Sequence, residues 1–509
     1  MQNKKKITLE KLGNLVEKYK KKGKKIVLCH GVFDLIHLGH IKHFEEAKRH
    51  GDVLIVTVTQ DEHVKKGPNR PVFSLHQRIE ALSALHIVDY VAANKWEKAV
   101  EAIKIIKPNI YCKGPDYKDN SLDFTKNIIQ EKNAIKSVGG KIEYTSAKAV
   151  FSSSNIINKF GNIHNKSQNK IINKIKKNFD FERINKIINT FKDLKVLVVG
   201  ETIIDQYFFC EAMGKSGKEP VLALRDLTME QYPGGAAAIA RHLSDFCKSV
   251  TLLSMLGEKA EYKNYIKKSV PKNIFFDFVY KKNSPTIVKK RFVEQVNKRK
   301  VLGVYNLNDD MLLKEDEKEF NHKLDKLIPK HDLVILTDYG HGFISDNSAH
   351  KICKKSSFVT LSAQVNSSNI GYHTMDKYKK IECAIINATE LRHDLRDKNL
   401  PIKLLMSKLA RKLKINNLVV TQGSEGAILF SAKQKKYFSS TAFATRVVDK
   451  IGAGDAMMSL LALCLKKNLD KEVSLLISSL AAAQSIETIG NKNAVSKNQI
   501  LKSIQYLLK

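Results

Sequence analysis

Between residues 24 and 160, short apolar runs alternate with amphipathic stretches. The runs have the length and the β-branched composition of buried strands, and the stretches between them carry apolar residues at helical spacing. The predicted strands are Lys25–Cys29, Val53–Thr59, Ile87–Ala92, Asn109–Cys112 and Lys141–Tyr144, and the predicted helices are 40–50, 75–86, 96–107 and 122–138. This alternation predicts an α/β domain whose parallel sheet is covered by helices on both faces.

The pattern changes after residue 160. Five lysines and no acidic residue lie between Lys166 and Lys177, which predicts an exposed linker or a solvated helix. A new strand at Lys195–Gly200 then opens a second α/β domain. Its later strands are predicted at Leu333–Asp338, Ile381–Asn387 and Leu418–Thr421. We therefore expect one domain at 1–161, a basic linker and helix at 162–192, and a second domain at 193–509.

The net charge of the 509-residue chain indicates which class of molecule it binds. Apolar residues make up 43% and charged residues 27%, an ordinary globular balance. Lys+Arg number 87 against 52 Asp+Glu, which gives a formal net charge of +35. The lysines are spread along the whole chain and form no basic stripe. We therefore expect phosphorylated small molecules, and no nucleic acid, as partners.

The hydropathy of the chain and its cysteines indicate in which cellular compartment the protein is expected. No apolar run approaches the roughly 20 residues that cross a bilayer, and the run at Ile26–Cys29 is too short for a signal peptide. The seven cysteines are scattered, without the spacing of a zinc site. We expect reduced thiols, a cytoplasmic protein and no membrane partner. The oligomeric state stays open, a homo-oligomer included.

The first candidate site follows the first predicted strand. Gly31, Phe33 and Asp34 come directly after it, and an HxGH motif with His37 and His40 follows at the mouth of a helix. Two histidines one helical turn apart can face one ligand, and the N-terminus of a helix favours an anion. These residues are candidates for binding a nucleotide phosphate.

Two later segments carry further phosphate-binding side chains. Lys113 lies just beyond a predicted strand end, where ligands bind in open α/β sheets. Ser152, Ser153 and Ser154 place three hydroxyls before an amphipathic helix, which is more than an N-cap requires. We expect the extra hydroxyls to hold triphosphate oxygens.

In combination, these motifs resemble the cytidylyltransferase-like family of nucleotidyltransferases over about residues 24–160. The resemblance implies a Rossmann-like fold in which His37 and His40 stabilise the α-phosphate as pyrophosphate leaves. It also implies that Lys113 and the three serines bind the triphosphate, together with Mg²⁺. Asp61 and Arg78 match less distinctive family positions. Such transfer depends mainly on positioning and charge neutralisation.

The second candidate site lies near the end of the chain, where Gly452, Ala453 and Gly454 precede Asp455. The glycines permit a tight turn at a helix N-terminus, with N–H groups that converge on an anion. Such a turn can stabilise a γ-phosphoryl group during transfer. Asp455 in the first helical turn is placed to accept a proton from an attacking hydroxyl.

With the motifs upstream, this turn resembles the ribokinase-like sugar kinase family over about residues 195–509. The resemblance implies an ATP-dependent kinase with Asp455 as the base. The other implied residues are Asp205, Gly234 and Gly235 for sugar hydroxyls, Asn387 and Glu390 for the indirect arrangement of Mg²⁺ and phosphate, and Gly423 for the nucleotide. The chain departs from the family at Lys450, usually Thr, at Met457, usually aromatic, and at Ser362–Gln364, usually acidic-Pro-Lys.

The pair of domains resembles the family of bifunctional heptose 7-phosphate kinase/heptose 1-phosphate adenylyltransferases of bacterial surface-sugar synthesis, in reversed domain order. In that resemblance, Lys289 and Arg291 grip a substrate phosphate. It implies a nucleoside triphosphate and a sugar phosphate as substrates. Two alternatives stay open: cytidylyl transfer and phosphorylation on another sugar or polyol phosphate, and a nucleic-acid- or partner-binding protein on degenerate enzyme folds.

Overall fold

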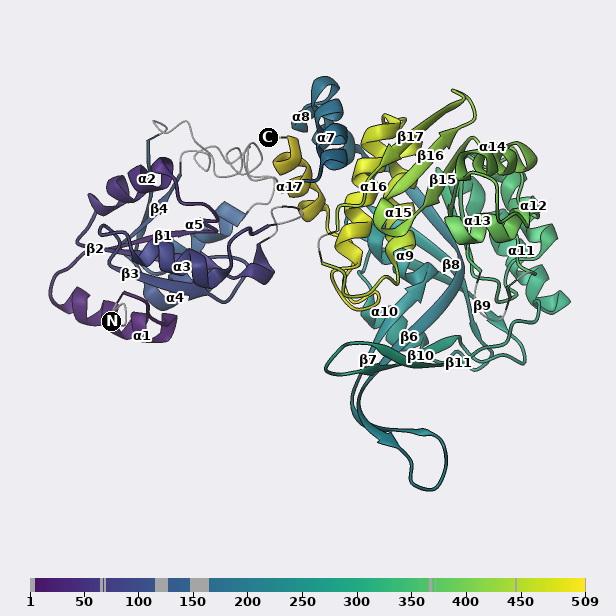
Figure 1. Ribbon diagram of the computed structural model, residues 1–509, viewed down its shortest axis with the longest axis horizontal. Helices are drawn as coiled ribbons and strands as arrows, with labels where there is room; N and C mark the ends of the chain where they lie inside the picture. Colours follow the sequence, from purple (N-terminus) through teal and green to yellow (C-terminus); the bar gives the residue numbers. More distant parts are fainter. Residues whose placement is uncertain are drawn as a thin grey trace. The chain divides into compact units, whose positions relative to one another are not determined.

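The computed structural model describes residues 5–64, 67, 70–114, 127–146, 164–365, 369–370, 372–444 and 446–508. Its contacts divide the chain into two compact units, residues 1–166 with 501–509, and residues 167–500 (Figure 1). No helix in these ranges is both long enough and apolar enough to cross a membrane. All seven cysteines are free.

The first unit contains a five-stranded parallel sheet in the order β3-β2-β1-β4-β5. Its strands are β1 (Ile26–Gly31), β2 (Val53–Thr59), β3 (Tyr90–Asn94), β4 (Ile110–Lys113) and β5 (Lys141–Tyr144). Its helices are α1 (Leu9–Lys21), α2 (Leu38–Lys48), α3 (Leu75–Ser83), α4 (Val100–Ile106) and α5 (Asn127–Ser137). The predicted α/β architecture is confirmed, and α1 is an addition that the sequence pattern did not predict.

Two hydrophobic cores lie on opposite faces of this sheet. Successive residues of β1 belong to alternate cores, with Leu28 in one and Cys29 in the other. The first core includes α1 and α4, and the second includes Phe44 of α2 and Leu82 of α3. Because side chains alternate across a strand, burial on both faces accounts for the nearly continuous apolar sequence of β1 and β2.

The second unit is built on one extended sheet in which β6 (Lys195–Lys215) belongs to two layers. Its first residues pair in parallel with β8 and β12, and its later residues pair with β7 and β10. We call the later part of β6, together with β7, β10 and β11, the side sheet (Figure 1). The other strands are β7 (Leu222–Gly235), β8 (Ser249–Gly257), β9 (Ile274–Lys281), β10 (Val288–Glu294), β11 (Lys300–Asn306), β12 (Leu333–Asp338), β13 (Val359–Ala363), β14 (Cys383–Asn387), β15 (Asn417–Thr421), β16 (Ala427–Ser431) and β17 (Lys436–Ser440).

Helices and a large apolar core cover the main part of this sheet. The helices of this unit are α7 (Lys166–Asn178), α8 (Phe181–Asn189), α9 (Ala236–Ser244), α10 (Lys263–Ser269), α11 (Lys314–Leu327), α12 (Asp346–Lys355), α13 (Ala388–Leu395), α14 (Ile402–Leu413), α15 (Ala453–Lys466) and α16 (Lys471–Ser485). The last helix, α17 (Lys497–Leu508), begins in this unit, and its residues from 501 on belong to the first unit. Of the two alternatives expected at 166–177, an exposed linker or a solvated helix, the structure has a helix, α7, but Ile172 and Ile175 on one face of it are buried. Its lysines take the other positions, which is why its composition alone resembles a linker.

Candidate active sites

The HxGH motif forms the start of α2. His37 is the N-cap of this helix, and its Nδ1 accepts a hydrogen bond from the Gly39 N–H at 3.0 Å. In the neutral ring, Nε2 therefore carries the proton. Burial lowers the pKa of His37, which favours the neutral form. Among the described residues, Nε2 is buried without a hydrogen-bond partner. The ring of His40 lies 4.1 Å from that of His37, centroid to centroid.

Phe33 packs beneath this histidine pair. Its backbone has a φ of +49°, and its ring lies edge-on to His40 at 5.3 Å. The same ring lies so close to Gly31 that a Cβ there would be 3.0 Å from it. The Phe33 ring thus packs between Gly31 and His40, and a larger residue than Gly at position 31 would displace it.

Asp34 is engaged within the fold. Its buried carboxylate accepts hydrogen bonds from the N–H groups of Val72 and Phe73 at 2.8 and 3.0 Å, and pairs with Arg70 at 3.1 Å. Nearby, the buried guanidinium of Arg78 donates to backbone carbonyls and to Asp61. Both side chains hold loops at the carboxyl ends of β1 and β2.

Lys113 ends β4, next to β1 at the point where the strand order reverses. Ligands bind at such points in open α/β sheets. Its ammonium lies 2.9 Å from the carboxylate of Glu131 on α5, which also accepts a bond from the Tyr111 hydroxyl at 3.1 Å. Burial raises the pKa of Glu131, but the charges of Lys113 and His30 and the hydrogen bonds from Lys113 and Tyr111 together outweigh it, so the pKa is lowered. The three predicted serines, Ser152–Ser154, lie outside the described residues.

In the second unit, Asp455 lies in the first turn of α15 and is buried. The Tyr339 hydroxyl and the Gln364 side-chain amide each donate to its Oδ1 at 3.1 Å. Burial raises the pKa of Asp455 to about 7, and the charges of Asp205 and Glu390 act in the same direction. A carboxylate with such a pKa can exchange a proton near neutral pH.

The two glycines before Asp455 have different surroundings. Gly452 is the N-cap of α15 with a φ of +87°, and a Cβ there would lie 2.3 Å from Oδ1 of Asn491. At Gly454, a Cβ would meet nothing within 4 Å. Gly452 is therefore required for the turn itself, whereas Gly454 leaves open space at the N-terminus of the helix.

Asp205, on β6, lies beside the predicted sugar-binding glycines. Its Oδ1 pairs with Arg291 at 2.5 Å, and a Cβ at Gly234 would lie 2.2 Å from its Oδ2. Lys289 is paired in register with Asp205 and is buried, with its ammonium 5.6 Å from the centre of the Tyr305 ring. Gly235 follows as the N-cap of α9. The structure thus gathers the predicted substrate residues of β6, β7 and β10.

Asn387 and Glu390 form a capping box at the start of α13. Oδ1 of Asn387 accepts from the Glu390 N–H at 2.8 Å, and Oε2 of Glu390 accepts from the Asn387 N–H at 3.0 Å. Burial raises the pKa of Glu390, and its charge in turn raises that of Asp455. Gly423 begins a short 3-10 helix with a φ of +60°, and a Cβ there would meet nothing within 4 Å.

Two more buried carboxylates lie behind this site. Glu201 accepts bonds from the N–H groups of Tyr339 and His341 at 3.0 and 3.1 Å. Burial and the nearby charge of Asp338 raise the pKa of Glu201 to about 7. Asp338 itself pairs with Lys377 at 2.7 Å. These bonds fix the loop after β12, which carries the Tyr339 hydroxyl to Asp455.

Sequence reasoning missed the three residues that hold the predicted catalytic side chains. Tyr339 directly follows the predicted strand Leu333–Asp338, but its hydrogen bond to Asp455 was not foreseen. Gln364 was noted only as a departure from the family pattern. Glu131 had no signal beyond its place in a predicted helix, because its partner Lys113 is distant in sequence.

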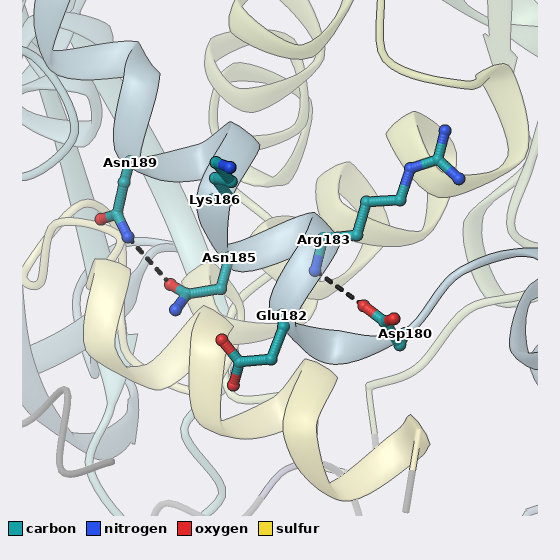
Figure 2. Close-up of a pocket in the computed structure, with 6 residues that line it drawn as sticks. All are labelled: Asp180, Glu182, Arg183, Asn185, Lys186 and Asn189. Atoms are coloured by element: carbon teal, nitrogen blue, oxygen red, sulfur yellow. Dashed lines mark hydrogen bonds between the residues drawn. The ribbon is translucent and has the colours of Figure 1, made fainter. Parts of the chain in front are cut away.

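A hollow of about 500 Å³ lies along α8, lined by Asp180, Glu182, Arg183, Asn185, Lys186 and Asn189 (Figure 2). Asp180 caps the helix by accepting from the Arg183 N–H at 2.7 Å. Asn189 donates to Asn185 at 3.1 Å. All six residues come from one helix and its cap, and none belongs to a candidate catalytic motif. This hollow therefore carries no candidate chemistry.

Comparisons with known proteins divide the chain in the same order. Residues 28–159 match the cytidylyltransferase-like family, and residues 193–498 match the pfkB family of carbohydrate kinases. Curated relatives named bifunctional protein HldE match over the cytidylyltransferase-like region. The protein from Aliarcobacter butzleri is 39% identical over 145 residues, 28% of this chain and 30% of the relative. That from Campylobacter jejuni subsp. doylei is 42% identical over 142 residues, 28% of each. The chain thus spans less than a third of the length of these relatives.

Solved structures resemble the second unit. A mutant of phosphofructokinase-2 from Escherichia coli superposes with a TM-score of 0.52 at 13% identity, covering 62% of this chain and all of that one. The same enzyme in complex with fructose-6-phosphate gives 0.50 at 15% identity, with the same coverage. At such identities the likeness shows the fold, and the family match covers more than half of the sequence. The chain belongs to the pfkB family of carbohydrate kinases, with a cytidylyltransferase-like domain in front of the kinase domain.

Proposed function

We propose that the chain is a bifunctional enzyme of nucleotide-sugar synthesis. The kinase domain would phosphorylate the anomeric hydroxyl of a heptose 7-phosphate with ATP. After a separate phosphatase removes the 7-phosphate, the N-terminal domain would transfer AMP from ATP to heptose 1-phosphate, giving ADP-heptose and pyrophosphate. The observation that carries the proposal is the presence, in one chain, of a pfkB domain and a domain similar to bifunctional HldE proteins.

For the kinase step, the sugar would lie between Asp205 and Asp455. The Asp455 carboxylate takes the proton from the anomeric hydroxyl as its oxygen attacks the γ-phosphorus of ATP, and ADP leaves. The N–H groups of the 452–454 turn stabilise the phosphoryl oxygens. A pKa of about 7 supports the role of Asp455, because a base works best when its pKa lies near the operating pH.

Asn387 and Glu390 fit an indirect role in holding Mg²⁺. Mg²⁺ keeps several waters and is bound by few carboxylates together with substrate phosphates. The Glu390 carboxylate is half-buried and close enough to Asp455 to raise its pKa. The ion would neutralise phosphate charge when bound, while the capping box fixes the orientation of the Glu390 carboxylate.

For nucleotidyl transfer, the sugar 1-phosphate oxygen would attack the α-phosphorus of ATP and expel pyrophosphate. Nδ1 of His37 accepts the hydrogen bond from the Gly39 N–H, so the Nε2–H group lies on the other side of the ring. This group can donate a hydrogen bond to a phosphate oxygen. Lys113, held by Glu131, supplies a fixed positive charge at the carboxyl edge of the sheet. This reaction would run in the cytoplasm, where ATP and reduced cysteines occur together.

A cytidylyltransferase acting on another sugar or polyol phosphate is the second candidate. The match of residues 28–159 to a family named for cytidylyl transfer favours it. The replacement of the family's acidic-Pro-Lys segment by Ser362–Gln364, with Gln364 bound to Asp455, also points to a different sugar in the kinase site.

A substrate panel distinguishes these proposals. The full chain is incubated with ATP or CTP and a set of sugar 1-phosphates, and pyrophosphate release is measured. In parallel, ATP is supplied with sugars and sugar phosphates, and ADP release is measured. Preference for ATP with heptose 1-phosphate and for heptose 7-phosphate as kinase substrate supports the first proposal. Preference for CTP, or for another sugar, supports the second.

A further inference from the structure

One carboxylate joins the turn before α15 to the side sheet. Asp449 lies three residues before Gly452, and its side chain is only 3% exposed. Four donors surround it in the described structure. They are the Lys300 ammonium at 2.6 Å and the Ile451 N–H at 3.2 Å on Oδ1, and the Tyr207 hydroxyl at 3.0 Å and the Gly490 N–H at 3.1 Å on Oδ2.

These donors come from four separate parts of the fold, and Gly490 belongs to the loop after α16. Ile451 belongs to the turn itself, Tyr207 to β6, and Lys300 to β11 at the edge of the side sheet. The charge of Lys300 and the N–H groups hold the pKa of Asp449 below its usual value, although its burial acts in the opposite direction. A buried carboxylate with four donors is fixed in place, because each broken bond leaves a buried polar group unsatisfied.

The same strands carry the sugar residues. Asp205 lies two residues before Tyr207 on β6, and the guanidinium of Arg291, its partner, lies 5.5 Å from the centre of the Tyr207 ring. A second connection runs through Asn491, whose side-chain amide donates to Oδ2 of Asp205 at 3.4 Å. Oδ1 of Asn491 is also the atom against which Gly452 packs.

Phosphoryl transfer requires the sugar hydroxyl and the γ-phosphoryl group to be held in line, within about 0.5 Å of the productive geometry. The sugar residues lie on the side sheet and the phosphoryl donors on the turn, so their relative position depends on what connects the two. We propose that Asp449 is the positioning residue that makes this connection, and that Lys300 on β11 completes it through its ion pair with Asp449. The proposal rests on the kinase function proposed above.

Three single variants test it. Lys300→Met removes the ammonium while keeping most of the length of the side chain, and Lys300→Arg keeps the charge. Arg225→Met is the matched control, because Arg225 pairs with Glu211 at 3.0 Å in the same sheet and both side chains are more than half exposed. We expect Lys300→Met to lower kcat for sugar phosphorylation about tenfold or more, with KM for ATP changed less than twofold. Lys300→Arg should restore most of the turnover, and Arg225→Met should match the wild type.

A double-mutant cycle separates positioning from general stability. Asp449→Asn removes the charge that Lys300 pairs with, so Lys300→Met should add little to its effect. Melting temperatures measured on the same preparations report the stability of each variant. Equal turnover in Lys300→Met and Arg225→Met, or additive losses in the double variant, would overturn the proposal.

Hydrogen–deuterium exchange of the unliganded full chain supplies a readout that needs no sugar. Peptides covering residues 449–455 should exchange faster in Lys300→Met than in the wild type or in Arg225→Met. Unchanged exchange in these peptides refutes the connection, even if the wild type is an active kinase. Faster exchange with no phosphorylation of any sugar in the panel leaves the connection standing and rejects the proposed function.

Discussion

At the scale of single residues, Asp455 has a position that favours chemistry over stability. Its carboxylate is buried against Tyr339 and Gln364, and both donate to the same oxygen. Because burial raises the pKa of Asp455 by more than these two hydrogen bonds lower it, the folded protein binds the Asp455 proton more tightly than the unfolded chain does, with a pKa of about 7 against 3.8. The resulting cost to stability is absent below about pH 4, increases as the pH rises to about 7, and is constant above that.

Replacing Asp455 with Asn should remove kinase activity and increase stability at the same time. Asn can still accept both hydrogen bonds, but it cannot take a proton, and general-base assistance is commonly worth about 10²–10⁴-fold. The loss should appear in kcat more than in KM for ATP. Nucleotidyl transfer serves as the internal control. Retention of more than about a tenth of wild-type kinase turnover would show that Asp455 is not the base.

The pH dependence of the two proteins should differ in a defined direction. In the wild type, kcat/KM for phosphorylation should rise with pH until about 7, as Asp455 loses its proton. The melting temperature of Asp455→Asn should exceed that of the wild type by more at pH 8 than at pH 4. If the melting temperature of the wild type instead exceeded that of Asp455→Asn, and by more at pH 8 than at pH 4, this result would contradict the burial of an ionised carboxylate at this position.

His37 offers a substitution that keeps its structural role and removes the chemical one. Asn is a preferred N-cap, so His37→Asn should preserve the start of α2 and the melting temperature. Its shorter side chain cannot place a donor where Nε2 lies, and nucleotidyl transfer should fall about a hundredfold. His40→Ala should give a comparable loss, and both variants should retain kinase activity. Equal damage to the two activities would indicate unfolding or one shared site.

At the scale of elements, the turn before α15 and the strand β6 decide how the kinase site is assembled. The turn sets N–H groups at the helix N-terminus, and β6 runs from the main sheet into the side sheet with Asp205 and Tyr207 on the way. The two elements meet at Asp449. Because β6 belongs to both the main sheet and the side sheet, Asp205 is held on a strand that also forms part of the core of the domain.

The two glycines of this turn should respond differently to the same methyl group. Gly452→Ala places a Cβ 2.3 Å from Asn491 at a positive φ, so the melting temperature should fall. Gly454→Ala places its Cβ in open space inside α15, where Ala is favoured over Gly by about 1 kcal/mol, so stability should be kept or increased. Its methyl group would occupy the path of the phosphoryl group, and kcat should fall at least tenfold. A fully active Gly454→Ala would place the anion site elsewhere.

At the scale of the whole molecule, the chain consists of two units with their own sheets and cores. Helix α7 belongs to the second unit, where Gln168 donates to the carbonyl of Ala442 at 2.8 Å and Lys174 pairs with Glu472. The basic segment that resembles a linker in composition therefore contributes to the kinase domain.

Fragments 1–166 and 167–509 should each fold and retain one activity when expressed apart, since each carries one set of motifs and the first fragment lacks only residues 501–509 of its unit. A second kinase fragment, 180–509, lacks α7 and exposes the surface that Ile172 and Ile175 cover. It should melt at a lower temperature than 167–509. Calorimetry and the two activity assays check this. If 167–509 and 180–509 melted at the same temperature, α7 would contribute nothing to the fold.

The sequence by itself determined the order of the two domains, the parallel sheet of the first, the α/β class of the second and the motifs at both sites. These features depend on local patterns: apolar runs of strand length, glycines at a tight turn, and side chains directly after a strand. The boundaries of β2 and β5 match their predicted ranges to the residue, because turn residues mark both ends.

Only the tertiary structure decided which side chains hold the catalytic ones. Three such contacts join residues that lie far apart in the chain. They pair Glu131 with Lys113, Gln364 with Asp455, and Lys300 with Asp449. The fold also decided that Asp34 pairs with Arg70. Periodicity and spacing report how a segment meets its own neighbours, whereas these contacts exist only after separate strands and helices have packed together, so no local pattern records them.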